Sequence, residues 1–244
     1  MLLSVENLRK TFSGTPVLHG IDLEIEKGDV VAIIGPSGSG KTTLLRCLNF
    51  LEKADGGRLT FADETFDLAK ISRNNALRIR KRTGFVFQNY NLFLNKTALE
   101  NITEGLIVGR GIKKELAQAK AHELLARFSL THRENAYPCE LSGGQQQRVA
   151  IARALAGDPD VIYFDEPTSA LDPELTRDVL SILKELAQQG LTMVVVTHEL
   201  SFAKGVANKI VFMEAGHVVE AGDAQTIFGN PKELRTKEFL ETLA

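Results

Sequence analysis

A glycine-rich run, Gly35-Pro36-Ser37-Gly38-Ser39-Gly40-Lys41-Thr42, constrains this chain more than any other part of it. The apolar residues 30–34 precede the run and predict a buried strand, and the mainly apolar residues 44–48 predict a helix after it. Strand, glycine loop and helix together are the context in which the pattern G-x-x-x-x-G-K-[ST] binds phosphates. The alternative, an ordinary glycine-rich turn, leaves the Lys-Thr pair at the helix start unexplained.

Each part of this phosphate loop has an expected role. Glycines let the backbone bend so that successive N–H groups face phosphate oxygens, and the helix that follows adds its positive dipole end. Lys41 is expected to reach the β- and γ-phosphates, and the Thr42 hydroxyl is expected to hold Mg²⁺. The sequence therefore predicts that a nucleoside triphosphate binds here.

Composition limits the remaining possibilities. The chain has 244 residues and a formal net charge of −2, so it lacks the basic excess typical of nucleic-acid binding. The two cysteines, Cys47 and Cys139, show no metal-type spacing, which favours a reduced, cytosolic chain. We expect no signal peptide, and no apolar run approaches the roughly 20 residues that span a bilayer.

Hydrophobic periodicity predicts strands that alternate with helices. Residues 2–28 and 58–66 predict half-exposed antiparallel strands, and residues 210–219 predict a hairpin. Buried strands are expected at 85–87, 161–164 and 193–196. Helices are expected at 74–82 (ended by Gly84), from 97 toward 108, at 114–128, from 143 toward 157, and from 173 toward 190, with two short helices at the end.

From Asn89 onward the residue pattern is typical of helices, which predicts an inserted subdomain. Residues 97–100 form a capping-box pattern. The apolar stripe expected on the helix at 114–128 comprises Leu116, Ala119, Leu124, Leu125 and Phe128. The sequence therefore predicts an α/β core of residues 1–88 and 159–244, with a helical subdomain at 89–158.

Polar side chains stand where three predicted buried strands end. Gln88 follows the first, Asp165 and Glu166 the second, and His198 the third. Ligands of open α/β sheets bind at that end of the strands. Asp165 is placed to help hold Mg²⁺, and Glu166 to orient and partly deprotonate a water near the γ-phosphate. His198 is expected to contact the γ-phosphate, although a lone histidine there is more often structural.

The run Leu141–Gln145 opens a helix with small residues and a hydroxyl, which is a second phosphate-binding arrangement. An N-cap role for Ser142 is the simpler alternative. One chain has no obvious use for two phosphate cradles, so we expect the second to serve the nucleotide of another copy in a twofold dimer.

Two further features remain open from the residues alone. Phe12 can stack on an adenine ring or belong to the core. The segment Asn89–Ile102, with Tyr90, Leu92, Phe93 and Leu94, can be a docking surface for a partner or part of the subdomain core.

The motifs, in this order and spacing, resemble the ATP-binding cassette of ABC transporters. They are Gly35–Thr42 (the Walker A motif), Gln88, Leu141–Gln145, Val161–Glu166, Ser169–Asp172 and His198. The resemblance covers residues 2–240. It implies a P-loop NTPase (RecA-like) fold: a mixed α/β sheet core with an N-terminal antiparallel β-subdomain and an inserted α-helical signature subdomain.

The resemblance also implies roles for individual residues. Catalysis is assigned to Glu166, His198, Lys41 and Gln88, and Mg²⁺ binding to Thr42, Gln88 and Asp165. ATP binding within one chain is assigned to Phe12, Gly35, Pro36, Ser37, Gly38, Ser39, Gly40, Lys41, Thr42 and Thr43. Contact with the ATP of a second copy is assigned to Ser142, Gly143, Gly144, Gln145 and Asp172.

The local sequences at residues 45–52, 140–148 and 165–173 resemble those of the polar amino acid uptake branch of that family. This implies an ATPase that powers import of cystine, glutamine, arginine or histidine from the cytoplasmic face of a bacterial inner membrane. A homodimer, two membrane permeases docked near Asn89–Ile102 and, indirectly, a solute-binding protein are the implied partners, with no nucleic acid.

Other function classes explain the chain less well. A soluble ABC ATPase acting on ribosomes or DNA usually carries two cassettes or a long coiled coil, and this chain shows neither. A P-loop kinase or GTPase leaves Leu141–Gln145 and His198 unexplained. A cassette of another importer or of an exporter is disfavoured only by the local sequence around the motifs.

Overall fold

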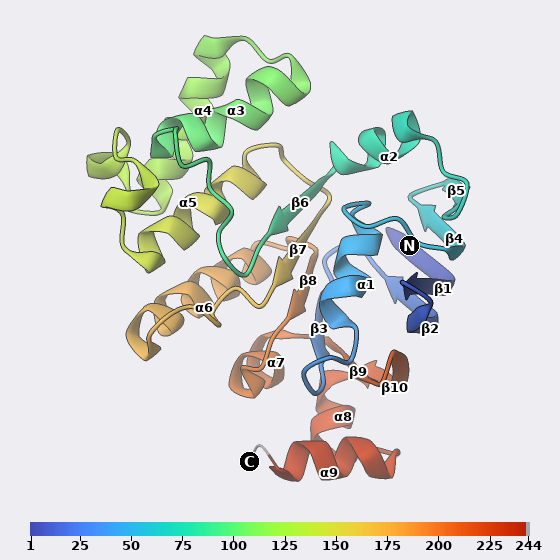
Figure 1. Cartoon of the computed structure of the whole chain (residues 1–244). Helices are drawn as coiled ribbons and strands as arrows, with labels where there is room; N and C mark the ends of the chain where they lie inside the picture. The colour runs from blue at the N-terminus through green and yellow to red at the C-terminus, as the bar shows by residue number, and fades with distance from the viewer. Residues whose placement is uncertain (243–244) are drawn as a thin grey trace. The chain divides into compact units, whose positions relative to one another are not determined.

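The computed structural model describes residues 1–242, which form two compact units (Figure 1). Within the described residues, unit 1 comprises residues 1–80 and 186–242, and unit 2 comprises Lys81–Glu185. Both units combine strands with helices, as expected for the mixed α/β P-loop NTPase fold. The predicted division into core and inserted subdomain at residues 88 and 159 stays a prediction.

Unit 1 begins with the predicted antiparallel sheet, whose strand order is β2-β1-β4-β5. The strands are β1 (Leu3–Phe12), β2 (Thr15–Ile25), β4 (Gly56–Phe61) and β5 (Glu64–Asp67). Along β2, Ile21, Leu23 and Ile25 are buried while Asp22 and Glu24 are exposed. This alternation buries one face and leaves the other in water, as its period of two residues requires.

The second set of strands in unit 1 has β3 (Val30–Ile34) at its centre. β3 pairs in parallel with β8 (Met193–Val196) on one side and with β9 (Lys209–Glu214) on the other. β10 (His217–Asp223) then pairs antiparallel with β9. Because β3 has neighbours on both edges and every one of its residues is buried, an uninterrupted apolar run suits it.

The helices described in unit 1 are α1 (Lys41–Leu48), α2 (Arg73–Arg80), α7 (Leu200–Val206), α8 (Ala224–Gly229) and α9 (Leu234–Thr242). α1 buries its apolar side chains and contacts β2 and β8. The sequence did not predict α7, which is only seven residues long and follows directly on the polar group at the end of β8.

Unit 2 contains two parallel strands, β6 (Thr83–Val86) and β7 (Val161–Asp165). Its helices are α3 (Ala98–Arg110), α4 (Lys114–Arg127), α5 (Gly143–Leu155) and α6 (Pro173–Gln188), whose last turn is counted with unit 1. Short 3₁₀ turns span Thr131–Arg133 and Pro138–Glu140. α3 contacts both α4 and α5, and these three helices form the green-to-yellow cluster in Figure 1.

Two details of unit 2 differ from the sequence predictions. The buried face of α4 is made by Ala117, Ala121, Leu124 and Leu125, whereas Leu116 is 64% exposed. Leu124, Leu125 and Phe128 are buried as predicted, but Leu116 and Ala119 are exposed and Ala117 and Ala121 are buried in their place, because small alanines do not mark the core side of a helix. Gly84 lies inside β6 rather than ending a helix, and a Cβ there would come 3.0 Å from the carbonyl oxygen of Ala154 on α5.

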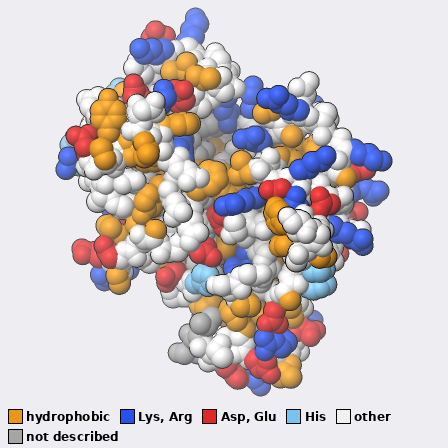
Figure 2. Space-filling view, in the orientation of Figure 1, with side chains coloured by type: hydrophobic (Ala, Val, Ile, Leu, Met, Phe, Trp, Pro, Cys, Tyr) orange, Lys and Arg blue, Asp and Glu red, His pale blue; other side chains and the backbone are white. Residues whose placement is uncertain are grey.

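Figure 2 shows basic, acidic and hydrophobic side chains intermingled over the visible face, in keeping with the formal net charge of −2. Across residues 1–242, no helix combines the length and the hydrophobicity that crossing a membrane requires.

The two cysteines are expected to differ sharply in reactivity, because the thiolate is the reactive form. Cys47 is buried on α1, and burial raises its pKa to about 12, whereas Cys139 is exposed. At pH 8 only about one Cys47 in 10⁴ is ionised, so a thiol reagent should modify Cys139 alone in the native protein. Mass spectrometry after brief labelling of the wild type and of Cys139→Ser checks this. Equal labelling of Cys47 would contradict the packing of α1.

Candidate nucleotide site

The phosphate loop connects β3 to α1 in unit 1, as predicted. Gly35 has φ 144°, and a Cβ there would lie 2.0 Å from the carbonyl oxygen of Met213 on β9. Gly40 caps α1 with φ 93°, and a Cβ there would lie 2.9 Å from the side chain of Leu18. Both positions thus need glycine for conformation and for space, because the loop lies directly against neighbouring backbone.

The polar groups inside the loop suit an anion. The ammonium group of Lys41 is turned back over the loop, where it donates to the carbonyl oxygens of Gly35 (2.9 Å) and Pro36 (2.8 Å). The buried hydroxyl oxygen of Ser39 has no hydrogen-bond partner among residues 1–242, which marks it as a group for a ligand. Thr42 and Thr43 lie in the first turn of α1, which contains no acidic residue. These features fit a phosphate at the positive end of the helix.

His198 lies at the same edge of unit 1 as the phosphate loop. Ile33 on β3 pairs with Val196 on β8, and the N–H of Thr197 donates to the carbonyl oxygen of Ile33 (3.3 Å). The chain therefore leaves both parallel strands at one level, into Gly35 and into the exposed His198. This is the neighbourhood that the predicted role of His198 requires.

Phe12, at the end of β1, is 41% exposed, so it is no core residue. The ammonium nitrogen of Lys10 lies 4.6 Å from the centre of its ring. An exposed aromatic ring can stack on an adenine base, as the first of the two alternatives requires.

Gln88 and the two carboxylates come together in unit 2. β6 and β7 run parallel with Val86 opposite Phe164, so Gln88 and Asp165 follow at the same edge. Gln88 Nε2 donates to Glu166 Oε2 at 3.3 Å. Asp165 is buried, whereas Glu166 is half-buried and has φ 47°, a left-handed conformation that is rare for residues with side chains. The pair is an amide and a carboxylate next to a second, buried carboxylate.

The start of α5 confirms the N-cap interpretation of Ser142 and is compatible with the other interpretation, a phosphate cradle. Its hydroxyl oxygen accepts from the N–H of Gln145 (3.3 Å), and Gln145 Oε1 accepts from the N–H of Ser142 (3.0 Å), which completes a capping box. Ser142 is exposed, and the first turn has no acidic residue, so the N-terminus of α5 also suits an anion. At Gly144 a Cβ would lie 2.7 Å from Leu175, and at Gly143 it would lie 2.9 Å from the hydroxyl of Tyr90.

Asp172 caps α6 as its sequence predicted. Its Oδ1 accepts from the N–H groups of Glu174 (3.0 Å) and Leu175 (2.9 Å). Its side chain is exposed, which is compatible with a contact to a second chain.

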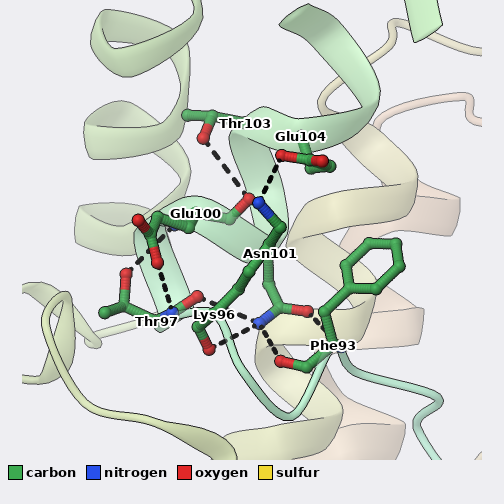
Figure 3. Close-up of polar contacts among 7 residues, drawn as sticks. All are labelled: Phe93, Lys96, Thr97, Glu100, Asn101, Thr103 and Glu104. Atoms are coloured by element: carbon green, nitrogen blue, oxygen red, sulfur yellow. Dashed lines mark hydrogen bonds and ion pairs between the residues drawn. The ribbon is translucent and has the colours of Figure 1, made fainter. Parts of the chain in front are cut away.

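The segment Asn89–Ile102 is held by a side chain that the sequence analysis missed, Asn101 (Figure 3). Its Nδ2 donates to the carbonyl oxygens of Phe93, Lys96 and Thr97, and its Oδ1 accepts from the N–H of Phe93. The capping box of Thr97 and Glu100 is present beside it. A fully buried polar residue on an otherwise apolar helical face was the signal for Asn101.

The apolar residues of the segment Asn89–Ile102 differ in exposure. Leu92 is buried, whereas Phe93 is 46% and Leu94 is 79% exposed. Val108 on α3 is also exposed, and Figure 2 shows hydrophobic side chains on the surface of this region. Leu92 therefore belongs to the core, and Phe93 and Leu94 are available to a partner.

Two more residues that the sequence analysis did not assign a role bind the site segments of unit 2. Arg153 on α5 donates to the carbonyl oxygens of Tyr90 (2.8 Å) and Asn91 (2.7 Å), and burial lowers its pKa to about 10. Gln147, on the same helix, donates to the carbonyl oxygen of Pro167. Polar side chains at helix positions that are otherwise apolar were the available signal.

Comparison with known proteins agrees with these features. Residues 18–169 match the family described as ABC transporter. The L-cystine transport system ATP-binding protein TcyN of Escherichia coli (strain K12) is 56% identical over 242 residues, which is 98% of this chain and 97% of that protein. The arginine transport ATP-binding protein ArtM of Bacillus subtilis (strain 168) is 50% identical, over 99% of this chain and 100% of that protein.

A solved structure of the ATP-binding cassette MJ0796, a dimer in a post-hydrolysis state bound to ADP and Pi, is also similar. It is 36% identical, with a TM-score of 0.81 over 91% of this chain and 99% of that one. The phosphate loop, the strand-end carboxylates, the capped α5 and these similarities lead to one conclusion: this chain belongs to the ABC transporter family.

Proposed function

We propose that this chain is the ATP-hydrolysing subunit of a bacterial importer for polar amino acids. It is an ABC ATPase by family. The observation that carries hydrolysis is the bond between Gln88 and Glu166 beside the buried Asp165, which sets a candidate base next to a candidate metal ligand. The names of the relatives, which transport cystine, arginine and glutamine, support import of amino acids of this class.

We assign nucleotide binding to the phosphate loop and Phe12. The loop N–H groups and the Ser39 hydroxyl would bind phosphate oxygens, and Lys41 would exchange its bonds to Gly35 and Pro36 for the β- and γ-phosphates. Phe12 would stack on the adenine. Thr42, Asp165 and Gln88 offer oxygen ligands of the kind that Mg²⁺ prefers and would hold this ion, which would stabilise negative charge on the phosphates.

Hydrolysis follows from the position of Glu166. Its carboxylate would accept a proton from the attacking water as the new oxygen–phosphorus bond forms and the bond between the γ-phosphorus and the β–γ bridging oxygen breaks. Gln88, which donates to Oε2, would orient this carboxylate, and His198 would donate to the γ-phosphate. The proton then leaves Glu166 with the released phosphate.

A second copy would complete the site. The exposed N-terminus of α5, with Ser142, Gly143, Gly144 and Gln145, would bind the γ-phosphate held by the other copy, and Asp172 would make a contact across the dimer. The similarity to a dimeric cassette bound to ADP and Pi supports this arrangement. Binding of ATP would close the dimer and hydrolysis would reopen it.

We place the permease contact on the segment Asn89–Ile102. Phe93 and Leu94 offer exposed apolar surface on a loop that Asn101 makes rigid, and the segment begins one residue after Gln88. A change at Gln88 during the ATP cycle can thus reach the two permeases, with the cassette at the cytoplasmic face of the membrane. The solute-binding protein would act through the permeases only.

The role of Glu166 is tested by Glu166→Gln. This variant should bind ATP normally and accumulate as a closed dimer, while its turnover falls by about 10²–10⁴-fold because the general base is lost. Steady-state phosphate release and nucleotide binding are the measurements. Glu174→Gln, at an exposed residue of α6, is the matched control and should keep normal turnover. Near-normal turnover in Glu166→Gln would remove Glu166 from this role.

The role of Ser142 is tested by Ser142→Arg in the Glu166→Gln background. The bulky cation should block the partner's γ-phosphate, so ATP-dependent dimerisation is abolished while ATP binding to the monomer is unchanged. Light scattering and nucleotide titration measure the two effects, with Ser181→Arg on the exposed face of α6 as the control. Loss of monomer affinity would show that the second cradle acts within one chain.

The docking segment is tested by Asn101→Leu, which keeps the size of the side chain but removes its four hydrogen bonds. Loosening of the 93–97 loop should weaken association with the permeases by roughly 5- to 30-fold, equivalent to about 1–2 kcal/mol, and leave the ATPase activity of the isolated chain unchanged. Reconstituted transport and pull-down measure this, with the exposed Asn135→Leu as control. Unchanged transport and unchanged association with the permeases would show that the permeases bind another surface.

A further inference from the structure

Gln147 on α5 is an unusual core residue. Its side chain is 0% exposed, and its Nε2 donates to the carbonyl oxygen of Pro167 at 2.7 Å. Within residues 1–242 its Oε1 has no hydrogen-bond partner. Burial of an unsatisfied amide oxygen costs free energy that a leucine or methionine would avoid. Stability alone therefore does not explain the amide, and its bond to Pro167 becomes the feature to account for.

Pro167 belongs to the turn that carries Glu166. Glu166 has φ 47°, a conformation that persists only where the surroundings impose it. The carbonyl oxygen of Glu166 accepts from the N–H (3.3 Å) and the hydroxyl (3.1 Å) of Ser169. Because proline has no N–H, the carbonyl of Pro167 is the one backbone hydrogen-bonding group through which the turn can be held at that residue.

The orientation of this turn decides where the carboxylate of Glu166 points. A rotation of the backbone at residues 166–167 moves the Cβ of Glu166 and with it the oxygen that accepts from Gln88. A displacement of reacting groups by about 1 Å can lower a rate by about 10²-fold. The bond from Gln147 is therefore placed to affect the reaction without touching the substrate.

We propose that Gln147 is a positioning residue, which holds the Glu166-Pro167 turn so that the Glu166 carboxylate faces Gln88 and the attacking water. The proposal rests on the role of Glu166 as general base and deepens it. α5 supplies the rigid support, since Gln147 lies in the middle of a helix that is capped at Ser142 and packed in unit 2.

The test is Gln147→Met, which preserves length and burial but removes the donor. The kcat for ATP should fall by about 10-fold with KM for ATP unchanged, as for a lost supporting hydrogen bond. In the Glu166→Gln background, single-turnover rates should fall by no more than about 2-fold, because a residue that acts through Glu166 has nothing left to position. Gln146→Met is the matched control: Gln146 donates to the carbonyl oxygen of Leu141 instead, and this variant should keep the wild-type kcat.

The outcomes separate this proposal from the proposed function. An unchanged kcat in folded Gln147→Met, or an equal loss in both backgrounds, overturns the positioning role while the loss in Glu166→Gln upholds the base. Normal turnover in Glu166→Gln overturns both. If Gln147→Met does not fold, Ser169→Ala decides, because the exposed Ser169 anchors the same turn. A lower kcat with constant KM in Ser169→Ala supports the proposal, and an unchanged kcat overturns it.

Discussion

The close approach of the phosphate loop to the backbone of β9 is the constraint on which unit 1 depends. A single Cβ at Gly35 would meet the carbonyl oxygen of Met213 at 2.0 Å. The buried strand β3 therefore delivers the chain into a turn that only glycine can make, and α1 starts where its N–H groups face the loop. The sequence order of strand, loop and helix follows from this packing, because any shift of β3 between β8 and β9 would displace the loop as well.

In unit 2, the segments that follow Gln88 and Glu166 are held by side chains that bond to their backbone carbonyl oxygens. Both side chains lie on α5: Arg153 donates to the segment after Gln88, and Gln147 to the turn after Glu166. The same helix presents the capped Ser142 at its start. Glu166, Gln88 and the exposed N-terminus of α5 thus depend on one element, so a change in its packing affects all three.

Predictions from the sequence were wrong where contacts with neighbouring helices and strands determine the structure. On α4, Leu124 and Leu125 are buried as predicted, but Ala117 and Ala121 are buried in place of Leu116 and Ala119, because alanine occurs on both faces of this helix and does not mark the core side. Gly84 looked like the end of a helix, yet it is glycine because β6 passes close to the backbone of α5. Asn101 and Gln147 stand out in the sequence only as polar residues at otherwise apolar helix positions. Their partners are carbonyl oxygens, which every residue has, so the sequence does not identify the partners.

The sequence by itself determined the family, most of the strands and helices, the phosphate loop and the candidate residues at the strand ends. These features depend on the spacing of residue types and on side-chain chemistry, which can be read directly from the sequence. Tertiary structure decided that Gln88 donates to Glu166, that Phe12 is exposed, and that Leu92 is buried while Leu94 is not. The physical reason is that exposure and hydrogen-bond pairing arise between segments far apart in the sequence, such as Gln88 and Glu166, which are 78 residues apart, and no local pattern specifies the partner.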